Sequence, residues 1–384
     1  MILHGDNMQI MPTLDAESFQ TCVTSPPYWG LRDYGIPGTK WSAVTYIPMP
    51  GMPEITVPEW TGCLGLEPTL EMFIAHIVLV FREVWRLLKP DGTAWVNFGD
   101  SYINDPGNGR GGDERSGLGN GGGTPHRSGT NKIGAADLKR KDLAGIPWRV
   151  AFALQADGWW LRSDIIWAKP NCMPESTPDR PTKAHEYIFL LAKSQRYYYD
   201  KEAIKEPGVG DEIANGFRGG SYTHDQTFDN QEGGKRKASG NFKVPTGWDT
   251  EDGAHGTIHR TGRTKNSFAG TGKESPPPGQ PLQKRADREP IDYSGMRNKR
   301  SVWTVATQGF AEAHFATFPE ALIRPCILAG APRGGRVLDP FGGSGTTLKV
   351  SEEEGRECTI IEIGEQYVDI AQRRTAVIQP TLNL

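Results

Sequence analysis

The sequence predicts an α/β fold in which a mainly parallel β-sheet is covered by helices on both faces. Two observations lead to this expectation. Short apolar runs with strand character alternate along the chain with segments whose apolar residues recur at helical spacing. A glycine-rich turn at residues 340–345 joins one of these strands directly to a helix, which is how parallel-sheet folds present their backbone to a ligand.

The expected elements follow one another in a regular order. The expected strands are residues 21–24, 93–98, 164–167, 187–191, 336–339 and 358–363. The expected helices are residues 70–88, 147–156, 319–329, 346–354 and 366–377. The first helix is the clearest, because Phe73, Ile77, Val80, Phe81 and Val84 fall on one helical face.

Composition limits the class of protein. The 384 residues suffice for one large core with an insertion, and 47 glycines and 29 prolines require much of the chain to be loop. The five cysteines form no Cys-x-x-Cys pair, so we predict neither a metal site nor a disulfide framework. Without a leader or a long apolar stretch, a cytoplasmic protein with no membrane partner is expected.

Two polar segments interrupt the alternating pattern. Residues 104–134 are dominated by Gly, Asn, Ser and Asp, so a long mobile loop inserted in the core is expected. Residues 208–300 are also polar, and from position 231 onwards they hold fourteen Lys and Arg against eight Asp and Glu, although the chain has a net charge of −3. Basic residues interspersed with aromatic ones suit a phosphate backbone. A solvated linker is the alternative.

The segment from Arg336 to Thr347 has the pattern of a strand, a turn of small residues and the start of a helix. Glycines allow the backbone to approach a ligand at the carboxyl end of such a strand. Glu362 lies about 20 residues further on, where a carboxylate accepts hydrogen bonds from a ribose. An adenosine-bearing cofactor is therefore predicted. A nicotinamide enzyme, or a tight turn beside a surface glutamate, would show the same pattern.

A second motif, Ser25-Pro26-Pro27-Tyr28, follows the first expected strand. Two prolines fix the backbone and leave carbonyls facing outward. The Ser25 hydroxyl and the Pro26 carbonyl therefore suit an –NH₂ group, and Tyr28 and Trp29 offer aromatic faces to a planar base. Such acceptors favour a pyramidal amine whose lone pair attacks a methyl group in line, on a base flipped out of its duplex. An ordinary turn or a polyproline ligand is the alternative.

Together the two motifs resemble the β-class S-adenosylmethionine-dependent amino-methyltransferases of DNA, in which the catalytic motif precedes the cofactor motif. The resemblance extends to residues 4–6, 87–93, 167–171, 180–187 and 314–319. It implies a Rossmann-like methyltransferase core with permuted motif order. Residues 1–200 would form the catalytic half of the core, 201–300 an inserted target-recognition region, and 301–384 the cofactor-binding half.

The resemblance also implies the roles of individual residues. Catalysis is assigned to Ser25, Pro26, Pro27 and Tyr28. S-adenosyl-L-methionine is expected against Asp6, Asp339, Pro340, Phe341, Gly342, Gly343, Ser344, Gly345, Thr346 and Glu362, with Asp6 at the adenine and Glu362 at the ribose. Residues 180–187 would border the target-base pocket. From the basic segment, Arg297, Lys299 and Arg300 are expected to bind DNA.

Serine at the first catalytic position resembles the cytosine-N4 subgroup more than the adenine-N6 subgroup, although a charged aspartate and a neutral serine can each bind an amine. The predicted reaction is therefore methylation of cytosine N4 in double-stranded DNA, with adenine N6 as the alternative. An inactive DNA-binding relative, or a methyltransferase of RNA or of a protein glutamine, also stays open. So do a homodimer, a cognate restriction endonuclease acting separately, and the roles of the long insertions at 37–61 and 104–134.

Overall fold

The computed structural model describes residues 1–30, 37–103, 138–139, 141–172, 174–175, 177–207, 296–308 and 318–376. The chain divides into two units, one formed by Met1–Glu206 with Arg297–Leu384 and the other by Pro207–Met296. The loop expected at 104–134 lies outside the described residues, as does the target-recognition region apart from 201–207 and 296–300. The tetrapeptide and the glycine turn both belong to the first unit.

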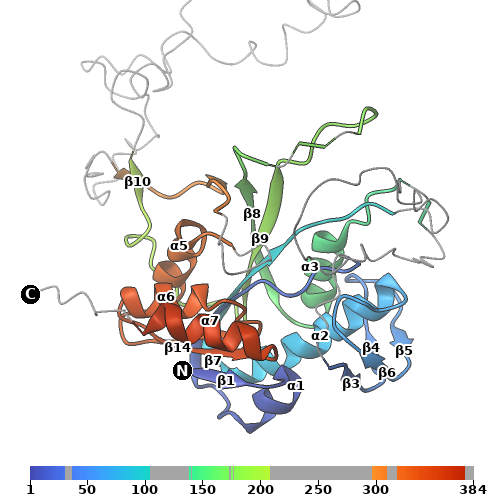
Figure 1. Ribbon diagram of the computed structural model, residues 1–384, viewed down its shortest axis with the longest axis horizontal. Helices are drawn as coiled ribbons and strands as arrows, with labels where there is room; N and C mark the ends of the chain where they lie inside the picture. Colours follow the sequence, from blue (N-terminus) through green and yellow to red (C-terminus); the bar gives the residue numbers. More distant parts are fainter. Residues whose placement is uncertain are drawn as a thin grey trace, which may run out of the picture. The chain divides into compact units, whose positions relative to one another are not determined.

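An eight-stranded sheet forms the centre of the first unit (Figure 1). Its order is β1 (Ile2–His4), β14 (Glu357–Glu362), β13 (Arg336–Asp339), β2 (Phe19–Thr24), β7 (Leu88–Phe98), β9 (His185–Ala192), β8 (Trp160–Ala168) and β12 (Val302–Thr304). Every neighbouring pair is parallel except the two that involve β9, which runs antiparallel to both β7 and β8. The predicted mainly parallel α/β sheet is confirmed.

Helices cover both faces of this sheet (Figure 1). One face carries α2 (Leu70–Leu87) and α3 (Ile146–Ala156), and the other carries α5 (Glu320–Gly330), α6 (Thr346–Glu353) and α7 (Glu365–Thr375). Successive strand residues point to opposite faces, so Val96 of β7 joins the first core and its neighbour Trp95 joins the second. The central strands are buried on both sides, which explains their continuous apolar character.

The neighbouring strands β13 and β2 mark a reversal in the chain's path through the sheet. From β13 the chain continues through α6 to β14 on one side, whereas from β2 it continues through α2 to β7 on the other. In α/β sheets, ligands bind beyond the carboxyl ends of the strands at such a switch point. The tetrapeptide that begins at Ser25 follows β2, and the turn that begins at Pro340 follows β13, so the fold places both motifs at this point.

The insertion expected at 37–61 is an ordered extension of the core. It forms two antiparallel pairs, β3 (Thr39–Trp41) with β6 (Trp60–Gly62) and β4 (Val44–Tyr46) with β5 (Ile55–Val57). Side chains of β4 and β5 are buried in the same core as α2. His76 of α2 stacks on Trp41 and Trp60, with ring centroids 4.5 and 5.7 Å away, and its Nδ1 lies 2.9 Å from Glu67 Oε1.

The remaining short elements lie near the amino terminus and at the boundary of the first unit. They are α1 (Asn7–Ile10), the 3₁₀ helix η1 (Met11–Thr13), β10 (Glu206–Pro207) and β11 (Met296–Arg297), the last two of which pair with each other. Within the part of the chain that the structure describes, no helix is both long and apolar enough to cross a membrane.

Candidate active site

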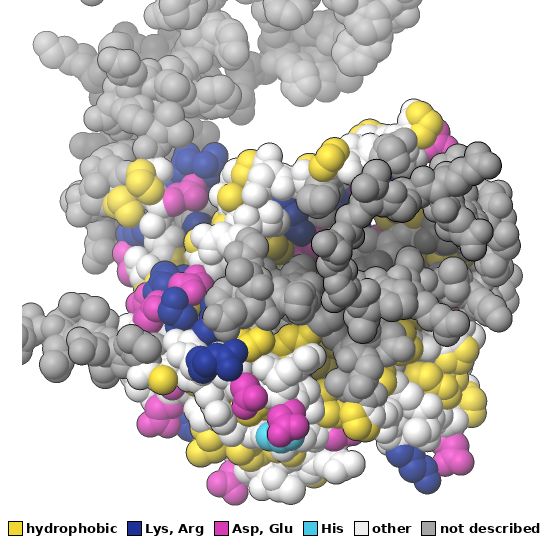
Figure 2. All heavy atoms as spheres, viewed as in Figure 1, with side chains coloured by type: hydrophobic (Ala, Val, Ile, Leu, Met, Phe, Trp, Pro, Cys, Tyr) yellow, Lys and Arg dark blue, Asp and Glu magenta, His cyan; other side chains and the backbone are white. Residues whose placement is uncertain are grey.

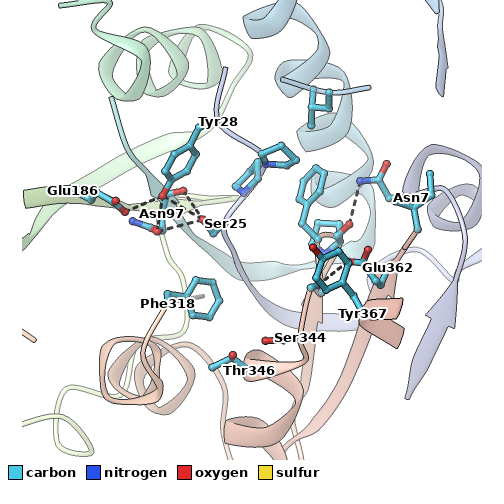
Figure 3. Close-up of a pocket in the computed structure, with 18 of the residues that line it drawn as sticks. Asn7, Ser25, Tyr28, Asn97, Glu186, Phe318, Ser344, Thr346, Glu362 and Tyr367 are labelled. Carbon is cyan, nitrogen blue, oxygen red and sulfur yellow. Dashed lines mark hydrogen bonds between the residues drawn. The ribbon is translucent and has the colours of Figure 1, made fainter. Parts of the chain in front are cut away.

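A cavity of about 720 Å³ lies beyond the carboxyl ends of the parallel strands, within the usual size of small-molecule sites. Residues after β1, β13 and β14 line one end, where Asn7, Glu362 and Tyr367 lie (Figure 3). Residues after β2, from β7 and from the start of β9 line the other end, where Ser25 and Glu186 lie (Figure 3). The two motifs therefore share one continuous cavity.

Glu362 fixes the glycine turn at the first end. Its Oε2 accepts a 2.8 Å hydrogen bond from Gly343 N, and its Oε1 accepts one of 2.7 Å from Gly364 N. Gly343 has φ of 51°, a left-handed conformation that favours glycine. Burial raises the pKa of Glu362 above its ordinary value, although both N–H groups act against this rise. Each carboxylate oxygen keeps a lone pair for a further donor.

Asp339 is buried beneath the cavity and is not among the residues that line it, so its expected contact with the cofactor stays a prediction. Its Oδ1 accepts hydrogen bonds from Thr24 Oγ1 at 2.6 Å and Phe341 N at 3.0 Å, and its Oδ2 accepts one from Thr347 Oγ1 at 2.7 Å. Burial raises the pKa of this carboxyl. Asp339 thus ties the end of β13 to the end of β2, one residue before Ser25.

Gly345 is the other predicted cofactor residue that does not line the cavity. It begins α6 with φ of 78°, and a Cβ there would stand 2.8 Å from the Cβ of Ala371 on α7. Position 345 therefore requires a glycine, because the backbone is left-handed at the start of α6 and because α7 packs closely against it. The cavity-lining members of the turn are Pro340, Phe341, Gly342, Gly343, Ser344 and Thr346.

Arg374 of α7 holds the polar side of this turn. Its Nη1 donates to Ser344 Oγ at 2.7 Å and to Thr346 Oγ1 at 3.1 Å. Burial lowers the pKa of Arg374, and the nearby Glu320 opposes that effect. The two hydroxyls are therefore kept at fixed positions on the cavity wall.

Asp6, which the resemblance places at the adenine, also lines the cavity. Its Oδ1 accepts from Met8 N at 2.8 Å and caps α1, while its Oδ2 accepts from Thr39 Oγ1 at 2.6 Å. The neighbouring Asn7 donates to Pro340 O at 3.1 Å. Asn7 thereby joins the two segments at this end, a link that the sequence did not reveal.

All four residues of the tetrapeptide line the second end of the cavity. Ser25 Oγ lies 3.3 Å from Asn97 Oδ1 and 3.4 Å from Asn97 O. Tyr28 Oη lies 2.9 Å from both Asn97 Oδ1 and Glu186 Oε2 (Figure 3). A Cβ on Gly99 would stand 2.6 Å from Tyr28 Cε2, so the tyrosine ring packs against this glycine. The hydroxyls of Ser25 and Tyr28 are held in one polar network.

Sequence reasoning did not single out Asn97 or Glu186. Asn97 is 4% exposed, and its Nδ2 donates to Tyr187 O at 3.0 Å, which turns Oδ1 toward Tyr28. A signal was available, because Asn97 is a polar residue within the apolar run at residues 94–98, which ends β7. Glu186 lies within the block at 180–187, but nothing in its spacing marks it from its neighbours.

Trp29 belongs to the core, so the expectation that it stacks on a base was wrong. Its side chain is 1% exposed, and its Nε1 donates to Glu67 O at 3.0 Å. Glu67 also accepts from Gly65 N at 2.8 Å, and Gly65 O accepts from Gly30 N at 2.7 Å. The buried pair of Glu67 and His76 thereby anchors the segment that follows Tyr28.

Cations approach Glu186 at the same end of the cavity. Lys169 Nζ forms an ion pair with Glu186 Oε1 and lies 4.1 Å from the ring centroid of Trp167. Lys183 Nζ is buried without a hydrogen-bond partner among the described residues, and burial lowers its pKa. Arg180 lies instead over Tyr102, 3.7 Å from the ring centroid. Of the block at 180–187, only Lys183 and Glu186 are among the residues that line the cavity.

The three basic residues predicted to bind DNA lie outside the cavity lining. Arg297 Nε and Arg300 Nε bind the same atom, Glu206 Oε1, at 3.0 and 2.7 Å. Lys299 Nζ lies 5.0 Å from the ring centroid of Trp303. Two of the three positive charges are therefore partly neutralised by one carboxylate.

Basic and acidic side chains also adjoin on the face shown in Figure 2, over helices α5 and α6. There Arg324 pairs with Glu353 at 2.7 Å, and Lys349 pairs with Glu320 at 2.7 Å. Paired charges attract a phosphate backbone less than unpaired ones do. The positive charges of Arg324 and Lys349 are therefore partly neutralised on this face.

Comparison with known proteins identifies the family. A family model described as DNA methylase matches residues 19–373. The Type II methyltransferase M.SmaI of Serratia marcescens is 37% identical over 373 residues, which cover 97% of this chain and 89% of that protein. The Type II methyltransferase M.Cfr9I of Citrobacter freundii is 36% identical over 374 residues, which cover 97% and 86%.

The fold is similar to that of the PvuII DNA methyltransferase (cytosine-N4-specific), with a TM-score of 0.51 and 15% identity, over 99% of this chain and 87% of that one. A nicotinamide enzyme is no longer needed to explain the glycine turn and Glu362, because the methylase model spans both motifs. The cofactor of the family is S-adenosyl-L-methionine. The chain therefore belongs to the N6/N4 DNA methylases, the S-adenosylmethionine-dependent amino-methyltransferases of DNA.

Proposed function

We propose that this chain methylates N4 of cytosine in double-stranded DNA, by direct attack of the amino group of a flipped base. The observation that carries the proposal is the position of Ser25 Oγ, a neutral acceptor that lines the same cavity as the glycine turn. An aspartate at this position would put a negative charge beside the amine. A serine leaves the acceptor neutral, which favours cytosine over adenine by the resemblance to the N4 subgroup.

The first end of the cavity fits S-adenosyl-L-methionine in its chemistry. Glu362 would accept from the ribose hydroxyls, and Asp6 would accept from the adenine amine. The Ser344 and Thr346 hydroxyls would face the methionine portion, and Phe341 would contact the adenosine. When S-adenosyl-L-methionine is bound, it supplies an electrophilic methyl group. The protein's part is to hold that methyl in line with the amine of the base.

The second end would hold the base. Ser25 Oγ and the Pro26 carbonyl would accept the two amino hydrogens, which favours a pyramidal nitrogen with a free lone pair. The Tyr28 ring, fixed against Gly99, would stack on the flipped base and replace part of the stacking lost from the duplex. DNA contacts by residues 208–295 and by Arg297, Lys299 and Arg300 stay predictions, as do a homodimer and a cognate endonuclease.

Analysis of the methylated product tests the proposal. Purified protein, tritiated S-adenosyl-L-methionine and unmethylated plasmid DNA are incubated, and the DNA is digested to nucleosides for chromatography and mass spectrometry. We expect N4-methylcytosine. N6-methyladenine would establish the alternative, and DNA binding without methyl transfer would identify an inactive relative. Parallel reactions with RNA or with a protein substrate in place of DNA test the other two classes of methyl acceptor.

A further inference from the structure

The hydrogen bonds around Tyr28 lack one proton. Its hydroxyl carries a single hydrogen, yet Asn97 Oδ1 and Glu186 Oε2 both lie 2.9 Å from Tyr28 Oη. The amide orientation is fixed, because Asn97 Nδ2 donates to Tyr187 O. The oxygens of Asn97 and Glu186 are therefore both acceptors whenever Glu186 is ionised, and the donors to Tyr28 Oη are the Ser25 hydroxyl and the Gly99 backbone. A proton on Glu186 would complete the network.

Amine methylation produces a proton at this place. The attack forms the N–CH₃ bond and breaks the CH₃–S bond, and it leaves a positive charge on a nitrogen that has one hydrogen too many. Ser25 Oγ, the proposed acceptor for that amine, is 3.5 Å from Tyr28 Oη. This separation is at the long end of hydrogen bonding, so proton transfer requires it to shorten when the base fills the site.

We propose that Glu186 is the terminal acceptor of this proton, reached through Ser25 and Tyr28. The N–H bond of the methylated amine breaks toward Ser25 Oγ, the Ser25 proton passes to Tyr28 Oη, and the Tyr28 proton passes to Glu186 Oε2. Both hydroxyls keep one hydrogen, the methylated amine becomes neutral, and Glu186 becomes a neutral acid. The inference rests on the proposed amine methylation, but it applies to cytosine N4 and adenine N6 alike.

The surroundings of Tyr28 favour a concerted order for its two proton transfers. Burial, and next the charge of Glu186, raise the pKa of Tyr28 well above its ordinary value. A free phenolate is therefore disfavoured, and the hydroxyl must receive one proton as it gives up the other. After transfer, Glu186 donates to Tyr28 Oη, which donates to Asn97 Oδ1, so each of these contacts contains a hydrogen.

The groups that face Glu186 suit a proton acceptor. Lys169, after β8, pairs with the oxygen that Tyr28 does not use. Lys183, before β9, adds a second positive charge whose ammonium has no hydrogen-bond partner among the described residues. The negative charges of Asp100 and Glu175 oppose the effect of burial and raise the pKa of Lys183. The two cations stabilise the negative charge of Glu186 before the proton arrives. Lys169 still binds Glu186 Oε1 after the transfer.

Single-turnover kinetics on DNA tests the relay, with saturating cofactor and a series of pH values. Glu186→Gln keeps the shape of the side chain but cannot take the proton. We expect its rate to fall about a hundredfold and its pH profile to differ from that of the natural protein, while DNA and cofactor affinities change by less than about threefold. The matched control is Glu59→Gln, because Glu59 is a 72% exposed carboxylate outside the cavity.

Tyr28→Phe provides a second variant, which keeps the aromatic ring but removes the hydroxyl. If both residues act in one relay, the double variant is no slower than the slower single variant. Additive losses, or a normal rate and pH profile in Glu186→Gln, would overturn the inference. Product analysis separates the two proposals: no methylated base with the natural protein would reject the proposed function and this inference with it.

A measurement without cofactor or DNA probes the same link. In protein labelled at tyrosine Cζ, carbon NMR follows each phenol through a pH titration, and Tyr28→Phe identifies the Tyr28 signal. Glu186→Gln removes the negative charge that raises the pKa of Tyr28, so Tyr28 should ionise at lower pH than in the natural protein. An unchanged titration would contradict the close coupling of Glu186 to Tyr28 on which the relay depends.

Discussion

Thr24 donates a 2.6 Å hydrogen bond to Asp339 and so joins the strand ends that carry the two halves of the site, although the residues are 315 positions apart in the chain. Asp339→Ala removes the acceptor for Thr24, Thr347 and the amide of Phe341. Because buried donors left without partners cost about 1–3 kcal/mol each, we expect a clear loss in the free energy of unfolding, measured in urea. Cofactor affinity should fall as a consequence.

Asp339→Asn serves as the matched variant. It retains one carbonyl oxygen for the buried donors, so its loss of stability should be smaller than that of Asp339→Ala. If Asp339 instead contacts the cofactor directly, both variants would lose affinity by calorimetry with unchanged unfolding free energies. That result would contradict a supporting role beneath the cavity.

Glu362 should make cofactor binding depend on pH. Ribose donors favour the ionised carboxylate, so binding weakens as pH falls and Glu362 takes up a proton. Because burial raises the pKa of Glu362, the weakening should begin at a higher pH than for an exposed glutamate. Calorimetry with S-adenosylhomocysteine between about pH 5 and 8 should show this slope, and Glu362→Gln should bind about tenfold more weakly without it. The exposed Glu365 supplies the control, Glu365→Gln.

Ser25→Ala should reduce methyl transfer at least about a hundredfold with little change in cofactor affinity. The Ser25 hydroxyl contacts only the second end of the cavity, through Asn97 and Tyr28. Ser194→Ala is a suitable control, since Ser194 does not line the cavity. A rate equal to that of the natural protein would remove Ser25 from the catalytic site.

Gly99→Ala should disturb Tyr28 by contact alone. The added methyl would stand 2.6 Å from Tyr28 Cε2, so the ring must move from its place beside Asn97 and Glu186. We expect a lower turnover number. On DNA that carries a fluorescent base analogue at the target position, we also expect a smaller change in fluorescence when the base is flipped. Normal turnover would show that the tyrosine ring adjusts without consequence.

Glu206→Ala should strengthen DNA binding if Arg297 and Arg300 contact phosphate. Glu206 now binds both guanidinium groups, and its removal frees them. Replacing the two arginines and Lys299 by Ala should weaken binding and flatten its salt dependence. Fluorescence anisotropy over a series of salt concentrations measures both effects. If binding is the same in all variants, the DNA surface lies elsewhere.

Much of the core could be predicted because its strands are buried on both faces. All six expected strands and all five expected helices are present, with ends shifted by a few residues. The edge strands β1 and β12 were missed, because a strand of three residues is too short to show a hydrophobic period in the sequence. The strands of the 37–61 insertion were hidden by prolines and glycines, and their burial depends on α2, which is distant in sequence.

The site was predictable where backbone geometry requires particular residues. Consecutive prolines and clustered glycines mark the tetrapeptide and the turn, and most of these residues line the cavity. Side-chain networks were not predictable, because the partners of Tyr28 come from β7 and β9. For the same reason, the three donors that Asp339 accepts from could not be predicted from its place in the motif.

The pairing of β1 with β14 has a consequence for how the protein folds. Leu3 aligns with Ile361, and Gly5 N donates to Glu362 O, so Asp6 and Glu362 become neighbours only when nearly the whole chain is available. A nascent chain on the ribosome thus carries Asp6, the residue proposed to contact the adenine, long before Glu362, the residue proposed to contact the ribose, has been made. High contact order slows such pairing, and we expect methylation activity to appear late in refolding, after most helical signal has returned.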